Sequence, residues 1–239
     1  MIVFLGDSFT WGQGLYSKKW IEEGKSIEYC NNNMPPGFSH ENISYSDDAY
    51  RRKYHFPSLV AKHYNRSYYT MPKNGGSNFR IYNVAKNIND LSNDNGIDFV
   101  IVQFTEFTRY IDYKIPIEFP RDNNLENIDD IIHDICKNQV KLVYDALKEN
   151  KIKNFLFFSW RPDISDVIKK YYNDHHIPIF YKGVTYDFLE FMLNKNQELE
   201  LRGDIGVDDG HLSELGHSVI AESIIKKVDT MGINFIRPK

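Results

Sequence analysis

Two segments at opposite ends of the chain carry residues that could perform nucleophilic catalysis. Ser8 follows an apolar stretch, residues 2–5, that predicts a strand just before the serine's turn. A serine hydroxyl attacks a carbonyl well only when a base takes its proton and hydrogen-bond donors stabilise the resulting oxyanion. His211 could be that base, and Asp208, three residues before it, could orient the imidazole. These residues predict a Ser-His-Asp triad with Ser8 as its nucleophile.

Other interpretations of these residues compete. Ser8 could cap the helix that follows it, a role that is compatible with catalysis. Asp7 is better suited to accept hydrogen bonds that stabilise the turn than to act as a catalytic acid. Asp209 adjoins Asp208 and could orient the imidazole instead. His217, at the start of the last predicted helix, is a second candidate for the base, but we favour its interpretation as a partly buried helix histidine.

Together the two segments resemble the SGNH (GDSL) hydrolase family. The first block of this family reads G-D-S-[LFY]-[ST]-x-G, and residues 6–12, GDSFTWG, match it at every position. The last block reads D-x-x-H, which residues 208–211 match with Asp208 as the acidic member. The blocks also lie where the family has them, after the first strand and before the last helix. The resemblance implies a serine hydrolase that needs neither a metal nor a cofactor.

The resemblance also implies an oxyanion hole built from three blocks. The backbone N–H of Ser8 is the first donor. Residues 74–78, NGGSN, follow the second predicted strand, and Gly76 is the natural second donor, although it could also be a turn glycine. Family members take the third donor from an asparagine in the pattern G-x-N-D after the third strand. This pattern is absent, and an ungapped match places Phe107 at the asparagine position.

A phenyl ring cannot donate a hydrogen bond, so another group must complete the hole or the hole lacks one donor. Thr105, Thr108 and Arg109 all carry donors near this position. We choose Thr105 because it lies at the end of the predicted strand. The choice matters, since loss of one oxyanion donor can slow turnover by roughly a hundredfold or more.

Several polar and aromatic residues near these blocks are candidates for substrate contact. A carboxylate would repel an oxyanion, so we expect Glu106 to pair with Arg109 or to contact substrate. Packing in the core or at its rim is the alternative for the aromatic residues. The predicted substrate-contacting residues are Trp11, Asn78, Glu106 and Arg109, and Trp160 and Arg161 are further candidates.

Apolar stretches alternate with segments of helical period along the chain. This pattern predicts a three-layer α/β/α sandwich around a mostly parallel five-stranded sheet, similar to SGNH hydrolase and flavodoxin-like folds. The length of 239 residues fits a single domain over residues 1–239. The predicted strands are residues 2–5, 68–71, 99–104, 154–159 and 179–181, and the predicted helices are residues 57–64, 79–91, 128–147 and 164–172.

Residues from about 16 to 55 interrupt this alternation. They are polar and aromatic, and they show no sustained period. Such a long irregular connection is often functional, and its place after the nucleophile predicts an insertion near the active site. A solvated insertion without a catalytic role is an equal alternative.

The composition of the chain limits which binding partners and which cellular location we expect for the protein. A formal net charge of −4 gives no support for binding nucleic acid or an anionic membrane. Cys30 and Cys136 are far apart and outside any zinc-ligand spacing, which predicts ordinary thiols. Neither a signal-peptide pattern nor an apolar stretch of membrane-spanning length is visible. We expect a soluble cytoplasmic protein, unless lysis or association with a particle carries it elsewhere, and no oligomeric state is predicted.

These observations predict a serine esterase that acts on a small-molecule or carbohydrate ester. The resemblance favours a short O-acyl group on a carbohydrate, acetyl above all. An O-acyltransferase with the same triad is an alternative, since only access of the acceptor separates transfer from hydrolysis. The other alternative is a binding or structural module, such as a viral one, that has this fold and little or no catalysis. The missing third-block asparagine supports that alternative.

Overall fold

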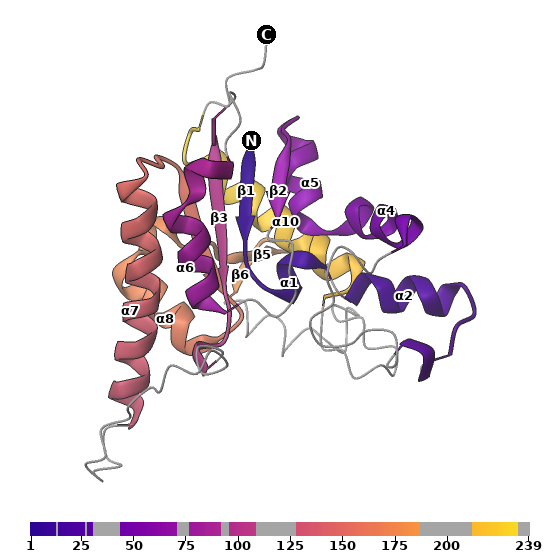
Figure 1. The fold of residues 1–239 in the computed structure, drawn as a ribbon, viewed down its shortest axis with the longest axis horizontal. Helices are drawn as coiled ribbons and strands as arrows, with labels where there is room; N and C mark the ends of the chain where they lie inside the picture. Colours follow the sequence, from indigo (N-terminus) through magenta and orange to yellow (C-terminus); the bar gives the residue numbers. More distant parts are fainter. Residues whose placement is uncertain are drawn as a thin grey trace.

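The computed structural model describes residues 1–12, 14–26, 28–30, 44–70, 77–91, 96–108, 128–186 and 212–233. Four parallel strands form its main sheet in the order β2-β1-β3-β4, and Figure 1 labels the first three of them. These strands are β1 (Ile2–Leu5), β2 (Tyr68–Thr70), β3 (Phe99–Phe104) and β4 (Phe155–Ser159). Because the strands are parallel, their carboxyl ends share one edge of the sheet.

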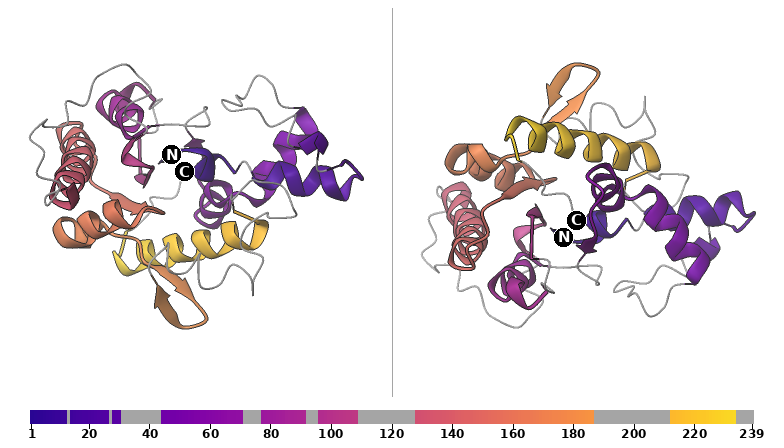
Figure 2. Two further views of the ribbon diagram at one scale, coloured as in Figure 1. Left: turned by 90° about the horizontal axis from the view of Figure 1, so that it is seen from below. Right: turned by 90° about the horizontal axis from the view of Figure 1, so that it is seen from above.

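Helices cover both faces of this sheet, which explains the continuous apolar sequence of its central strands. Val3 and Leu5 of β1 pack against one layer of helices, and Ile2 and Phe4 pack against the other. The predicted three-layer arrangement is therefore confirmed for the described residues (Figure 2). The first layer holds α6 (Asn78–Lys86), α7 (Ile128–Glu149) and α8 (Pro162–Tyr171), and the second holds α5 (Phe56–His63) and α10 (Glu214–Thr230).

The fifth predicted strand exists, but it does not join the main sheet. Instead, β5 (Ile179–Tyr181) pairs antiparallel with β6 (Val184–Tyr186) in a two-stranded hairpin. Lys182 and Gly183 turn the chain with φ angles of 46° and 83°. Two successive positive φ angles suit a two-residue hairpin turn, so the chain folds back on β5 at once.

The chain before β5 does touch the main sheet. His176 forms an isolated parallel bridge with Phe157 of β4, and the N–H of Ile177 donates to the Phe157 carbonyl at 2.9 Å. After this bridge the described chain makes no further ladder with β4 and enters the β5–β6 hairpin instead. The described main sheet therefore has four strands where the sequence predicted five.

Residues 16–55 are more regular than their sequence predicted. The helices α2 (Gly14–Glu22) and α4 (Tyr45–Tyr54) include much of this segment, and residues 31–43 lie outside the described ranges. An ion pair of 2.5 Å between Lys19 and Asp47 joins the two helices. The buried residues of α4 are Asp47 and Arg51. A helix that buries charged residues shows no apolar stripe, so its period is not visible in the sequence.

The other described elements are short, and they are α1 (Ser8–Trp11), η2 (Ile88–Leu91) and η5 (Asn173–His175). Cys30 and Cys136 are both buried, and neither forms a disulfide. Among the helices of the described ranges, none combines the length and the apolar character needed to cross a membrane.

Candidate active site

The first sequence block forms a tight turn at the carboxyl edge of the sheet. β1 ends at Leu5, and Ser8 is the first residue of α1. Glycine is required at position 6, because a Cβ atom on Gly6 would lie 2.1 Å from Oγ1 of Thr10. The serine therefore occupies the edge where open α/β sheets place their chemistry.

A buried carboxylate holds this turn together. Asp7 is 2% exposed and accepts a hydrogen bond of 3.0 Å from the N–H of Phe9. Two side chains at the end of β3 also donate to it, namely Nε2 of Gln103 at 2.9 Å and the hydroxyl of Thr105 at 2.7 Å. The indole N–H of Trp160 lies 3.4 Å from the same carboxylate. The prediction that Asp7 accepts the hydrogen bonds of the turn is confirmed.

Thr105 is fully buried, and its hydrogen bonds do not fit the oxyanion role expected from the sequence. Its hydroxyl has one proton, which is directed to Asp7. Its N–H donates to Oδ1 of Asn78 at 2.9 Å, and its carbonyl accepts from Nδ2 of the same asparagine at 3.0 Å. The Thr105 hydroxyl could reach an oxyanion only if it left Asp7, so its position here is that of a support for the turn.

Asn78 is also unsuited to its expected contact with substrate, because it is 3% exposed. Besides Thr105, its Nδ2 donates to Oε1 of Gln139 on α7 at 2.6 Å. Gln139 in turn donates through Nε2 to the carbonyl of Phe107 at 3.2 Å. Two buried amides thus hold the backbone of the loop after β3, where the sequence has Phe107 in place of the expected asparagine.

Partly exposed polar groups lie next to this network, at the ends of β3 and β4. Arg161 approaches Glu106 at 4.0 Å and Asp163 at 3.4 Å. The ring of Trp160 stacks on Phe9, the residue after Ser8, with centroids 5.4 Å apart. About a third of each of the Glu106 and Arg161 side chains is exposed, so both can meet a ligand at this edge of the sheet.

The remaining predicted residues lie outside what the structure describes. Their placement, and with it the triad, stays a prediction. These are Gly76, Arg109, Asp208, Asp209 and His211, together with the side chains of Ser8 and Trp11.

His217 has the structural role that its sequence position suggested, and it is fully buried rather than partly buried. It lies in α10, whose first turn is capped by the Ser213 hydroxyl. Its Nδ1 accepts a hydrogen bond of 3.3 Å from the N–H of Phe56, and the two rings pack with centroids 5.7 Å apart. These contacts make His217 part of the core between α5 and α10.

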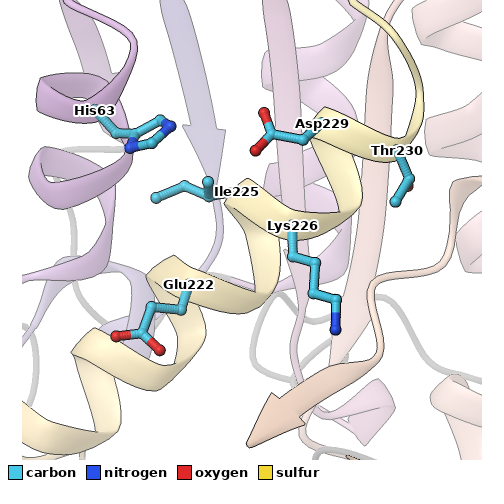
Figure 3. A pocket seen from close by; sticks show the side chains of 6 residues that line it. All are labelled: His63, Glu222, Ile225, Lys226, Asp229 and Thr230. Carbon is cyan, nitrogen blue, oxygen red and sulfur yellow. The ribbon is translucent and has the colours of Figure 1, made fainter. Parts of the chain in front are cut away.

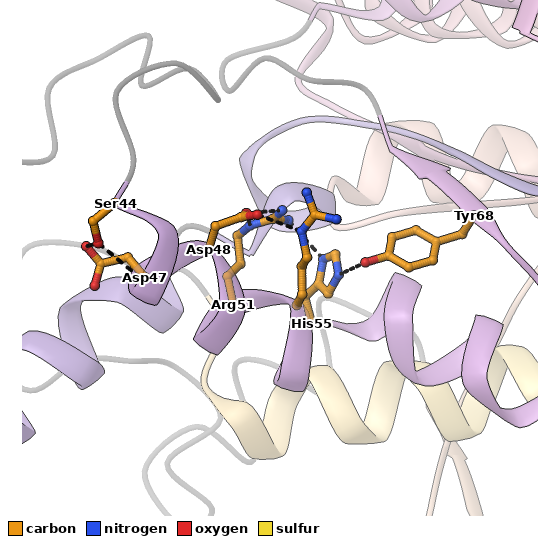
Figure 4. Close-up of polar contacts among 7 residues, drawn as sticks. Ser44, Asp47, Asp48, Arg51, His55 and Tyr68 are labelled. Carbon is orange, nitrogen blue, oxygen red and sulfur yellow. Dashed lines mark hydrogen bonds and ion pairs between the residues drawn. The ribbon is translucent and has the colours of Figure 1, made fainter.

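A second polar cluster lies beside the turn of Ser8, and no motif marks it in the sequence. His55, between α4 and α5, is fully buried. Nη1 of Arg51 lies 3.2 Å from its Nδ1, and the Tyr68 hydroxyl lies 3.1 Å from its Nε2 (Figure 4). Burial, and then the positive charge of Arg51 and the neighbouring His217, hold the pKa of His55 well below its usual range. The imidazole is therefore neutral at pH 7.

Gln103 and Gln139 also belong to the hydrogen-bond network of the site, although no sequence motif indicated them. Gln103 is the one polar residue of the strand sequence FVIVQF, and its Oε1 accepts from the Thr10 hydroxyl at 2.7 Å. An uncharged polar residue inside an otherwise apolar buried strand is a usable signal, because a buried amide needs partners. Gln139 gives no such signal, since it lies in a long amphipathic helix.

A surface depression of about 510 Å³ lies between α5 and α10 (Figure 3). Its lining combines His63, Glu222, Lys226 and Asp229 with an apolar side chain, Ile225. These α10 residues are at least two helical turns beyond Glu214, so the depression is not part of the candidate active site. Within the described residues, no group of three or more His, Cys, Asp or Glu side chains could hold a metal ion.

No family model and no curated protein matches this sequence. Solved structures match it over nearly its whole length at low identity. The chain is similar to LAE5, an alpha/beta hydrolase enzyme from the metagenome of Lake Arreo, Spain, with 14% identity, a TM-score of 0.46, and coverage of 98% of this chain and 96% of that one.

Two further solved structures also match nearly the whole chain at low identity. A protein of the G-D-S-L family from Desulfitobacterium hafniense DCB-2 is 9% identical, with a TM-score of 0.40 and coverage of 95% of this chain and 98% of that one. A single-residue variant of an acetyl xylan esterase from Geobacillus stearothermophilus is 12% identical, with a TM-score of 0.31 and coverage of 99% and 96%. These identities and scores are too low to transfer an activity to this chain.

Proposed function

We propose that this chain is a serine hydrolase of the SGNH type that cleaves a carboxylic ester. The observation that carries the proposal is the place of Ser8, which begins α1 at the carboxyl end of β1. The buried Asp7 fixes this turn through donors from β3 and α1. A rigid turn of this kind can present the backbone N–H of its serine to an oxyanion without reorganisation during the reaction.

The start of α10 supports a meeting of the two sequence blocks. Leu212 directly follows the proposed base, His211, and it is buried in the apolar cluster between the sheet and α10. Phe9 directly follows Ser8, and it packs against the same cluster. The chain segments next to the proposed nucleophile and the proposed base thus contribute to one core, which favours a short distance between the two groups.

In the proposed reaction, the Ser8 oxygen attacks the ester carbonyl while His211 takes the hydroxyl proton. The N–H groups of Ser8 and Gly76 stabilise the oxyanion of the tetrahedral intermediate. The intermediate collapses as the carbon–oxygen bond breaks, and His211 gives its proton to the leaving alcohol. Water then attacks the acyl-enzyme by the same path, which releases the acid and restores Ser8. Asp208 keeps the imidazole oriented throughout.

Thr105 enters this proposal as a support and not as the third oxyanion donor. Its hydroxyl stabilises the Asp7 carboxylate, and its backbone is held by Asn78. A loose turn would move the Ser8 N–H away from the position of the oxyanion. The role of Thr105 is therefore to keep one proposed donor in place.

The proposed substrate is a short O-acyl ester of a carbohydrate, with acetyl favoured. The resemblance in the first and last blocks suggests this class. The partly exposed carboxylate of Glu106 and guanidinium of Arg161 support it, because these groups can accept from and donate to sugar hydroxyls. They lie at the edge of the sheet where Ser8 begins α1.

One observation favours the second candidate, a binding module with little catalysis. The loop after β3 lacks the family asparagine, and the hydroxyl of Thr105 is bonded to Asp7. Two oxyanion donors would then have to act without a third. An enzyme of this kind would be slower by roughly a hundredfold or more than one with a complete hole.

Hydrolysis of p-nitrophenyl acetate separates the two candidates. Ser8→Ala and His211→Ala should each remove most of the turnover, and the double variant should be little slower than either, because the members of a triad act together. Ser67→Ala changes an exposed serine and should keep the wild-type rate. Unchanged turnover in Ser8→Ala would exclude Ser8 as the nucleophile. A wild type inactive toward every short acyl ester would favour the binding module.

A further inference from the structure

His55 lies at a junction of elements that also carry the proposed catalytic groups. Its backbone connects α4 to α5, and its side chain is fully buried. Arginine has no acceptor, so Arg51 must donate to Nδ1 of His55. In the neutral ring the proton is then on Nε2, which faces the Tyr68 hydroxyl. The contacts of one imidazole thus define its tautomer and its orientation.

The first element at this junction is α1, which begins with Ser8. α1 ends at Trp11, and the next residue, Gly12, lies against His55. The approach is close, because a Cβ atom on Gly12 would lie 3.0 Å from Cβ of His55. Gly12 also has a φ of 86°, which favours glycine. The chain at the end of α1 therefore packs directly against His55.

The second element is β2, which precedes Gly76 in the sequence. The Tyr68 hydroxyl meets His55 Nε2 at 3.1 Å, and the two rings contact edge to face with centroids 5.6 Å apart. Tyr68 pairs with Ile2 in the parallel ladder between β2 and β1. The tyrosine thus joins His55 to the strand that precedes the proposed second oxyanion donor.

The third element is α10, which begins three residues after His211. The residue after His55 donates its N–H to Nδ1 of His217 in this helix. At the start of α10, Glu214 accepts a hydrogen bond from Tyr50 of α4 and forms an ion pair of 3.2 Å with Lys18 of α2. The helices α2 and α4 therefore hold the beginning of α10 as well as the end of α1.

We propose that His55 is a positioning residue that fixes α1, β2 and α10 relative to one another, and thereby aligns Ser8, Gly76 and His211. This inference rests on the proposed hydrolase function, but its evidence comes from other residues. The sequence left the role of residues 16–55 open. The proposal assigns α2 and α4 of this segment a positioning role in catalysis. An error of about 1 Å in such an alignment can cost roughly a hundredfold in rate.

The test compares His55→Phe with His55→Gln. Phenylalanine fills the site but leaves Arg51 and Tyr68 without their ring partner, whereas the glutamine amide can accept from one and donate to the other. With p-nitrophenyl acetate, His55→Phe should lower kcat by about tenfold to a hundredfold while KM changes less than about threefold. His55→Gln should recover most of that loss. Both are assayed well below their unfolding temperatures.

A matched control removes a hydroxyl elsewhere on the same helical layer. Tyr64 donates to Asp229 at 2.9 Å, between α5 and α10 and away from the edge that carries Ser8. Tyr64→Phe should lower the unfolding temperature and keep the wild-type kcat. If the His55→Phe variant folds and keeps the wild-type kcat, His55 does not have the proposed positioning role. If His55→Phe does not fold, Tyr68→Phe decides in its place, and an unchanged kcat there overturns the role.

The same assay separates this inference from the function on which it rests. A wild type without Ser8-dependent turnover would refute the hydrolase, and the positioning role would fall with it. A wild type with Ser8-dependent turnover and an unaffected His55→Phe would refute the positioning role alone.

Discussion

The Thr105 hydroxyl donates a hydrogen bond of 2.7 Å to Asp7, a residue 98 positions earlier in the sequence. The contact joins the end of β3 to the turn before Ser8. Both residues are buried, so the hydrogen bond is shielded from water. Thr105, which the sequence suggested as an oxyanion donor, therefore stabilises the turn that carries the proposed nucleophile, Ser8.

Thr105→Val tests this support. Valine has nearly the same shape but no hydroxyl, so the buried Asp7 loses one donor. We expect the free energy of unfolding to fall by about 1–3 kcal/mol, measured by urea denaturation. Thr105→Ser keeps the hydroxyl and should lose less. Thr108→Val, on an exposed residue of the same loop, should be neutral.

The kinetics of Thr105→Val distinguish support from direct donation. If the hydroxyl served an oxyanion, the variant would keep its stability and lose about tenfold to a thousandfold in turnover. Support through Asp7 predicts that stability falls together with kcat. Full stability with greatly reduced turnover would contradict the geometry described above.

Asn78→Ala should destabilise the loop after β3. The substitution removes three hydrogen bonds and leaves the buried N–H of Thr105 and Oε1 of Gln139 without the partner that Asn78 supplies. We expect a loss of about 2–5 kcal/mol in the free energy of unfolding. Asn83→Ala, an exposed asparagine of the same helix, should change it by less than about 0.5 kcal/mol. Equal effects of the two substitutions would show that the Asn78 contacts do not stabilise the fold.

The lowered pKa of His55 predicts a loss of stability in mild acid. Below its usual pKa of about 6.5, the imidazole binds a proton in the unfolded chain but stays neutral in the folded one. The unfolded state then holds more protons, so stability falls as the pH drops from about 6.5 toward the folded pKa. The slope reaches up to about 1.4 kcal/mol for each pH unit.

His55→Gln removes this group and should flatten the pH dependence between pH 6.5 and 5. The pKa of His175 is also lowered, first by burial, but His175 is present in both proteins and cancels in the comparison. Urea denaturation at several pH values measures the difference. Parallel stability curves for the wild type and His55→Gln would contradict the neutral buried state of His55.

Arg161→Ala tests the proposed carbohydrate contact. It should raise KM for an acetylated sugar by about tenfold and leave KM for p-nitrophenyl acetate nearly unchanged, because the small ester has no hydroxyls to bind. Lys169→Ala, in the last turn of α8 and away from Arg161, serves as the control for a lost positive charge. An equal change in KM for both esters would argue against a sugar contact at Arg161.

The layers of the fold could be predicted because the strands that are buried on both faces are also the apolar stretches of the sequence. β1, β3 and β4 are buried on both faces, and their sequences are apolar except for Gln103 and Ser159 near the strand ends. The strand at residues 179–181 was also predicted correctly, but not its pairing. Its antiparallel pairing with β6 depends on the turn at Lys182 and Gly183, which a search for apolar stretches does not weigh.

The supports of the candidate site could not be predicted in the same way. Asn78 and Thr105 are 27 positions apart, and only the fold brings them together. The helix α4 buries Arg51 instead of an apolar stripe, so no period marks it. Asp7, by contrast, was predictable, because a carboxylate in a tight turn beside a strand needs nearby donors.

Covalent labelling of Ser8 tests the central claim most directly. The protein is incubated with a fluorophosphonate, and intact mass followed by peptide mapping locates the adduct, so no knowledge of the substrate is needed. The proposed function predicts one adduct on Ser8 in the wild type, none in Ser8→Ala, and much slower labelling in His211→Ala, since the base activates the hydroxyl. An unlabelled wild type, or an adduct on another residue that Ser8→Ala retains, would contradict it.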